Sequence, residues 1–182
     1  MGAAVDGLGL RRPILVAHSL GALAAIDYAG RHPGRVAGLL LVDPGGDQTR
    51  LPDGDRRRMH RVLARDPRGE TEWNFRHFLA GAAPRVADRV MESLAATRDE
   101  ALRGALEGSL SYSPSAALER IDGPVRILVS ELNRSPHGLH NLRSDLPVRR
   151  LGRASHWLMM DRPDEVWAEL VELLDDLRRE VN

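Results

Sequence analysis

The stretch that most constrains the fold lies close to the start of the chain, at residues 13–23, with the sequence PILVAHSLGAL. Four apolar residues typical of a strand, 14–17, are followed by His18 and Ser19, and helix-forming residues begin at once after the serine. A strand that turns this sharply into a helix pushes the side chain at the turn, Ser19, out above the sheet in a strained backbone conformation. Small residues are expected on either side, at Ala17 and Gly21, because the two backbones come close there. The sequence therefore predicts an exposed serine hydroxyl at the end of a strand.

Three more segments have the composition of strands. Residues 36–42 (VAGLLLV) and 125–130 (VRILVS) are apolar runs, and a shorter one covers residues 148–151. The continuous apolar character of 14–17 and 36–42 predicts strands that are buried on both faces, as in a parallel sheet. The helix expected over residues 20–31 would join these two strands in a right-handed βαβ unit. The fold class is therefore α/β, with a mostly parallel sheet and flanking helices.

The middle of the chain has a different pattern. Between residues 47 and 120, apolar residues recur at helical spacing, prolines interrupt the pattern, and no segment alternates as a strand would. We expect three to five short helices here and interpret them as a lid. The predicted organisation is an α/β core formed by residues 1–46 and 121–182, with a helical lid inserted at 47–120.

The bulk composition limits the partners and cofactors. The formal net charge is zero, so nothing favours nucleic acid or an anionic membrane as a partner. There is no cysteine, and the seven histidines lack the spacings of common metal sites, so we expect no metal and no cofactor. No signal peptide or membrane span is recognisable, and we expect a cytoplasmic protein.

A serine hydroxyl is a poor nucleophile unless a base removes its proton, and that base is most often a histidine oriented by a carboxylate. The candidate base is His156, because it follows the last expected strand at the edge of the sheet where open α/β folds bind ligands. His18 is interpreted as a residue that packs or forms a hydrogen bond. His137 and His140 lie in a polar loop and are interpreted as surface residues.

Four segments together resemble the α/β-hydrolase superfamily, in its serine-nucleophile, lid-bearing, esterase- or lipase-like branch. They are AHSLGAL at the serine, LLLVDP at the end of the second expected strand, GPVRILV at the third, and SHWLMMDRPDEV near the end. The first glycine of the family's G-x-S-x-G nucleophile elbow is replaced here by Ala17. The resemblance implies Ser19 as the nucleophile, His156 as the base, and a carboxylate between them in the chain.

The position of this carboxylate is open. The family usually carries it in the loop after the strand that ends here at residue 130, where Arg134 occupies the expected position and Glu131 is the remaining acid. Some relatives carry it at the end of the strand after the elbow helix, which is the position of Asp43. Three interpretations therefore remain: Asp43, Glu131, or no functional acid.

The resemblance also implies an oxyanion hole. One donor would be the backbone N–H of Leu20, and the other would come from a loop after an earlier strand of the family. That loop and the family's first strands would precede Met1, so the chain resembles the C-terminal two-thirds of a hydrolase. We therefore expect an uncovered sheet edge beside residues 14–17, which is a hazard for aggregation.

Two functions remain. The first is a serine hydrolase that acts on a small-molecule ester or similar acyl substrate through a Ser-His-acid triad and an acyl-enzyme. The second is a non-catalytic, truncated or degenerate relative that acts as a binding domain. The sequence does not decide the substrate or the oligomeric state.

Overall fold

The centre of the molecule is a parallel sheet of four strands. A computed structural model describes residues 1–181, with the side chains of residues 1–179. The strands pair in the order of the sequence: β1 (Ile14–His18), β2 (Gly38–Val42), β3 (Val125–Ser130) and β4 (Val148–Leu151). Their bounds differ from the predicted ones by at most two residues. The α/β class with a parallel sheet and flanking helices is confirmed.

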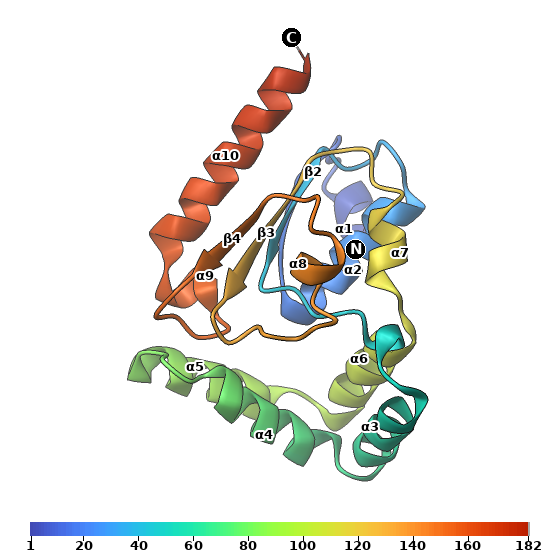
Figure 1. Cartoon of the computed structure of the whole chain (residues 1–182), viewed down its shortest axis with the longest axis vertical. Helices are drawn as coiled ribbons and strands as arrows, with labels where there is room; N and C mark the ends of the chain where they lie inside the picture. The colour runs from blue at the N-terminus through green and yellow to red at the C-terminus, as the bar shows by residue number, and fades with distance from the viewer. Residues whose placement is uncertain (182) are drawn as a thin grey trace.

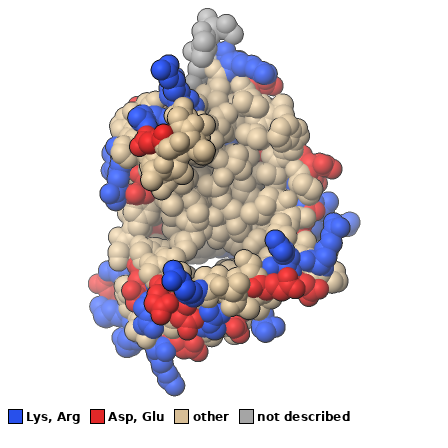
Figure 2. All heavy atoms as spheres, turned by 180° about the vertical axis from the view of Figure 1, so that it is seen from behind, with Lys and Arg blue, Asp and Glu red and all other residues tan. Residues whose placement is uncertain are grey.

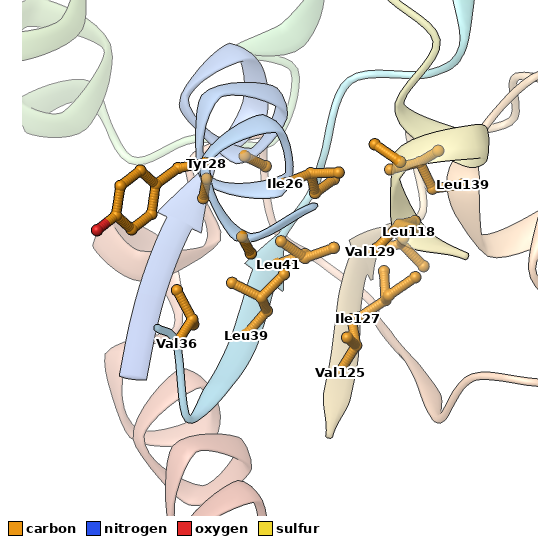
Figure 3. Packing of buried hydrophobic residues seen from close by; sticks show 14 of the residues in the cluster. Ile26, Tyr28, Val36, Leu39, Leu41, Leu118, Val125, Ile127, Val129 and Leu139 are labelled. Atoms are coloured by element: carbon orange, nitrogen blue, oxygen red, sulfur yellow. The ribbon is translucent and has the colours of Figure 1, made fainter. Parts of the chain in front are cut away.

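Helices cover both faces of this sheet (Figure 1). On one face lie α1 (Gly2–Gly7), α2 (Ser19–Arg31), α7 (Pro114–Leu118) and α8 (Leu139–Leu142); on the other lie α9 (Leu158–Asp161) and α10 (Pro163–Val181). Side chains alternate along β2, so that Leu39 and Leu41 join the α2 side while Leu40 and Val42 join the α10 side. Figure 3 shows the first of these clusters, in which Leu39 and Leu41 meet Ile26 of α2. The apolar run of β2 is therefore explained by burial on both faces.

The same prediction is wrong for β1. Val16, in the middle of this strand, is 51% exposed, although Leu15 and Ala17 pack against the α2-side cluster. The reason is that β1 is the edge strand and α10 packs mainly on β2 and β3. The expected close approach at Gly21 is also not present: this residue is exposed, and an added Cβ would meet no heavy atom within 4 Å.

The chain between β2 and β3 is helical, as expected. After the short 3-10 turn η1 (Gln48–Arg50), it forms α3 (Asp53–Arg65), α4 (Pro67–Phe78), α5 (Pro84–Ala96) and α6 (Asp99–Ser111), followed by α7. Figure 1 shows α3 to α6 as a layer beyond the carboxyl ends of the strands, whereas α7 returns to the side of the sheet. Residue 47, where this segment begins, is anchored to its far end, because Asp47 accepts hydrogen bonds from the hydroxyls of Ser113 and Ser115.

Charged side chains are unevenly distributed over the surface. Figure 2 shows both signs of charge gathered on the helical layer and around the rim, with a broad face between them that carries almost none. Within residues 1–181, no helix has the length and apolar content needed to cross a bilayer.

Candidate active site

Ser19 lies where β1 ends and α2 begins. Its backbone has φ of +51°, a left-handed conformation that non-glycine residues seldom adopt and that costs about 1–3 kcal/mol. Asp43, at the end of the neighbouring strand β2, is strained in the same way, with φ of +44°. The two turns are tied together, because the N–H of Gly45 donates to the carbonyl oxygen of Ser19 at 3.2 Å. Strained backbone of this kind is found where a fold positions functional side chains.

The side chains of Ser19, His156 and Asp43 form one hydrogen-bonded chain. His156 Nδ1 lies 2.7 Å from Asp43 Oδ2, and because an ionised carboxylate can only accept, this nitrogen carries the proton. The other ring nitrogen, Nε2, lies 2.7 Å from Ser19 Oγ and can therefore accept the hydroxyl proton. These residues are 24 and 113 positions apart along the chain, from Ser19 to Asp43 and from Asp43 to His156. The two adjacent strand ends and the loop after β4 bring them together.

The Asp43 carboxylate is fully buried and receives four donors. Besides His156, Ser130 donates to it through its N–H at 3.2 Å and its hydroxyl at 2.6 Å, and Asn133 donates through its amide at 2.9 Å. Burial alone would raise the pKa of Asp43, but the hydrogen bond and charge of His156, together with Ser130 and Asn133, outweigh it and lower this pKa. The carboxylate is therefore held ionised, in position to stabilise a protonated His156.

Of the two candidate acids, only Asp43 contacts His156. Among the described residues, no hydrogen bond joins Glu131 to that histidine, and the carboxylate of Glu131 instead lies close to the backbone of Gly152. Arg134 donates from Nε to the carbonyl oxygen of Glu131 at 3.2 Å. Ser130 and Asn133, which orient Asp43, were not singled out in the sequence; their place at the end of the adjacent strand β3 is the signal that could have found them.

His156 is held from two sides through its backbone. Its N–H donates to the carbonyl oxygen of Phe78 at the end of α4, at 2.9 Å, and its carbonyl oxygen lies 2.9 Å from His18 Nε2. Burial and the nearby charge of His156 lower the pKa of His18 to about 4, against the raising effects of its hydrogen bond to the His156 carbonyl and of Asp43. His18 is therefore neutral at pH 7 and donates from Nε2, which agrees with its interpretation as a hydrogen-bonding residue.

Leu20 is the second residue of α2, so its backbone N–H has no acceptor within the helix. It lies next to Ser19 at the positive end of the helix dipole, where a developing negative charge would be stabilised. No group of three or more His, Asp or Glu side chains in the described part of the chain is arranged to hold a metal ion. The contacts of Ser19 with His156 and of His156 with Asp43 are an arrangement that can activate a hydroxyl nucleophile.

The helical segment contributes apolar rings next to this site. The ring of Phe78 lies 4.9 Å from that of His156, and the ring of Phe75 lies 5.0 Å from that of Trp157, measured between centroids. Trp157 also packs with Val86 and Val90 of α5. The helices of 47–120 thus form an apolar wall against the residues that follow β4.

Comparison with known proteins gives one matching family. The model of the Alpha/beta hydrolase family matches residues 2–169 of the chain. No curated protein sequence matches it significantly.

Several solved structures share the fold. Bromoperoxidase from Bacillus anthracis has a TM-score of 0.74 at 13% identity, covering 96% of this chain and 71% of that one. MenH from S. aureus has a TM-score of 0.73 at 13% identity, with 96% and 72% covered. A thermophilic esterase from Thermogutta terrifontis has a TM-score of 0.72 at 21% identity, with 96% and 69% covered.

Proposed function

Because the chain belongs to the alpha/beta hydrolase family, we propose that it is a serine hydrolase that cleaves an ester or a similar acyl compound. The observation that carries this proposal is the hydrogen-bonded chain from Ser19 Oγ through His156 to Asp43, with two contacts of 2.7 Å. An esterase is among the structures that share the fold, and a serine at this position suits acyl transfer.

In the proposed mechanism, Ser19 Oγ forms a bond to the acyl carbon while its proton moves to His156 Nε2. The resulting oxyanion is stabilised by the N–H of Leu20. When the tetrahedral intermediate collapses, the bond to the alkoxide breaks and His156 returns the proton to that leaving group. Water then attacks the acyl-enzyme with His156 as the base, and this step releases the carboxylic acid and restores Ser19.

Asp43 has two tasks in this scheme. It fixes the ring of His156 with Nε2 toward the serine, and its negative charge stabilises the imidazolium that forms during each proton transfer. Its own orientation comes from Ser130 and Asn133. Of the three interpretations open in the sequence, we therefore propose Asp43 as the acid.

We further propose that residues 47–120 act as a lid over an apolar acyl pocket. The support is the contact of Phe78 and Phe75 with His156 and Trp157. The proposed substrate is a small molecule with an apolar acyl group.

A fluorophosphonate probe tests the function, because such reagents react only with an activated serine. We expect the wild-type chain to be labelled and to hydrolyse short-chain p-nitrophenyl esters, and Ser19→Ala to lose both activities. Ser111→Ala, at an exposed position on α6, is the matched control and should keep both. A folded wild-type chain that neither labels nor turns over any ester would favour the alternative, a non-catalytic binding domain.

A further inference from the structure

A concave region lies beside the loop after β3, whose residue Asn133 donates to Asp43. This cleft, with a volume of about 430 Å³, is formed by the loop after β3, by α8 and by β4, and its lining residues are Glu131, Arg134, His140, Asn141 and Arg150. Its size is within the range of small-molecule sites, about 300–1,000 Å³. None of its residues belongs to the chain of Ser19, His156 and Asp43.

The two arginines of the cleft have no acidic partner. Among the described side chains, no carboxylate lies within ion-pair distance of Arg134 or Arg150, although both occupy a wall that includes Glu131. Arg134 uses only Nε, on the carbonyl oxygen of Glu131, and Arg150 uses only Nη1, on the carbonyl oxygens of Ser130 and Asn133. Each guanidinium therefore keeps N–H groups that can donate to a further acceptor.

The arginine that precedes Arg150 on β4 differs in this respect. Arg149 points to the other face of the sheet and lies 3.6 Å from the buried carboxylate of Glu169, which also pairs with Arg126 at 2.6 Å. Positive charge on that face is matched by acids of α10. On the cleft side, two positive groups face one negative group, Glu131.

The cleft also contains a buried histidine with unmet hydrogen-bonding capacity. His140 is only 7% exposed, and neither ring nitrogen has a partner within residues 1–179, so its interpretation as a surface residue is wrong. Helix α8 places it there, because Leu139 is fully buried in the core. Burial and the charge of Arg150 lower the pKa of His140, although Asp43 acts in the opposite direction. The ring of His140 therefore lies within the electrostatic influence of Arg150.

We propose that this cleft binds a small organic anion through a carboxylate or phosphate group that accepts hydrogen bonds from Arg134 and Arg150. Guanidinium groups match the planar, bidentate geometry of such oxyanions, and hydrogen bonds between two charged groups are the strong ones. Asn141 adds a polar side chain to the same wall. The negative charge of Glu131 in the same cleft repels the anion and therefore lowers its affinity.

Calorimetric titration of the full chain with inorganic phosphate and with succinate, at fixed ionic strength, tests the proposal. We expect saturable binding of one ion per chain, and the tighter of the two probes identifies the group that is recognised. Arg134→Gln should weaken this binding about tenfold, since one charged hydrogen-bond donor is lost. Glu131→Gln should strengthen it, and Arg149→Gln, the same change of charge on the other face of β4, should leave it unchanged.

Three results would overturn the proposal: no saturable binding of either probe, an equal loss in Arg134→Gln and Arg149→Gln, or weaker binding in Glu131→Gln. Arg134 is exposed, so its variant should retain the wild-type melting temperature, which circular dichroism checks. The proposal does not rest on the hydrolase chemistry. Ser19→Ala should bind the anion as the wild type does. The hydrolase proposal is tested by labelling and turnover and the anion site by calorimetry, so each can fail without the other.

Discussion

His18 and His156 are joined through a backbone contact and a ring contact. His18 Nε2 donates to the carbonyl oxygen of His156 at 2.9 Å, and the centroids of the two rings are 4.5 Å apart. His18, which precedes the proposed nucleophile Ser19 in the sequence, thus holds the loop that carries the proposed base, His156. His18 is neutral in this contact at pH 7, because its pKa is lowered to about 4 by burial and by the charge of His156, in opposition to its hydrogen bond and to Asp43.

The stability of the protein should therefore fall between pH 6.5 and pH 4. In the unfolded chain His18 binds a proton below its ordinary pKa of 6.5, whereas in the folded protein it does so only below about 4. The unfolded state binds more protons in this window, so the contribution of His18 is complete above pH 6.5 and decreases as the pH falls. The loss for His18 is about 3 kcal/mol, and the lowered pKa of His140 adds to it.

Urea unfolding at several pH values measures this dependence. His18→Gln keeps a side-chain N–H donor but cannot titrate, so its free energy of unfolding should change less between pH 7 and pH 4 than that of the wild type. His60→Gln, at an exposed position of α3, is the control and should follow the wild type. If the free energy of unfolding changes equally with pH in His18→Gln and in the wild type, His18 is not the buried, neutral group described here.

Removal of the charge of Asp43 should nearly abolish turnover. Asp43→Asn keeps the shape of the side chain but cannot stabilise a protonated His156, and we expect kcat to fall on the order of 10³- to 10⁴-fold. Glu131→Gln is the matched control, because that carboxylate does not contact His156, and it should retain wild-type kcat. Steady-state kinetics on p-nitrophenyl acetate distinguish them, and unchanged turnover in Asp43→Asn would rule out Asp43 as the acid.

Ser130 should act on the reaction through Asp43 alone. Ser130→Ala removes a hydroxyl that donates to the carboxylate at 2.6 Å, and we expect kcat to fall about tenfold with little change in KM. Ser130→Thr, which keeps the hydroxyl, should recover a large part of the loss. If KM rises instead while kcat is retained, Ser130 serves substrate binding and the assignment is wrong.

The contact of Phe78 with His156 predicts a role for α4 in binding the acyl group. Phe78→Ala removes an apolar ring 4.9 Å from that of His156, and we expect kcat/KM for apolar p-nitrophenyl esters to fall about five- to tenfold. Trp73→Ala, on the same helix but 58% exposed, should have little effect. Equal kcat/KM values for the two variants and the wild type would argue against a lid that forms part of the pocket.

Asp47 should be essential for the attachment of the helical segment. Its fully buried carboxylate accepts hydrogen bonds from Thr49, Ser113 and Ser115, and so joins the beginning and the end of that segment. Asp47→Asn would place an amide against these donors and should lower the free energy of unfolding by about 2–4 kcal/mol. Asp53→Asn, an exposed carboxylate on α3, should cost less than 1 kcal/mol, as is usual for surface pairs. Urea denaturation compares the two, and equal losses would contradict the anchoring role.

Local chemistry determined a large part of this protein from its sequence. The apolar run of β2 needs burial on two faces, and the turn from strand to helix at Ser19 is recognisable from the residues around it, so the α/β class followed from short segments. His156 could be identified because it follows the last strand.

Only the tertiary structure shows which of the two carboxylates lies against His156. Asp43 and Glu131 each follow a strand end, and distance in space, not in sequence, determines that Asp43 makes this contact. The exposure of Val16 likewise depends on which strand lies at the edge of the sheet, and an apolar run cannot report this. His140 is expected at the surface from its place in a largely polar loop. His140 is buried because the neighbouring Leu139 packs in the core and so fixes the position of helix α8.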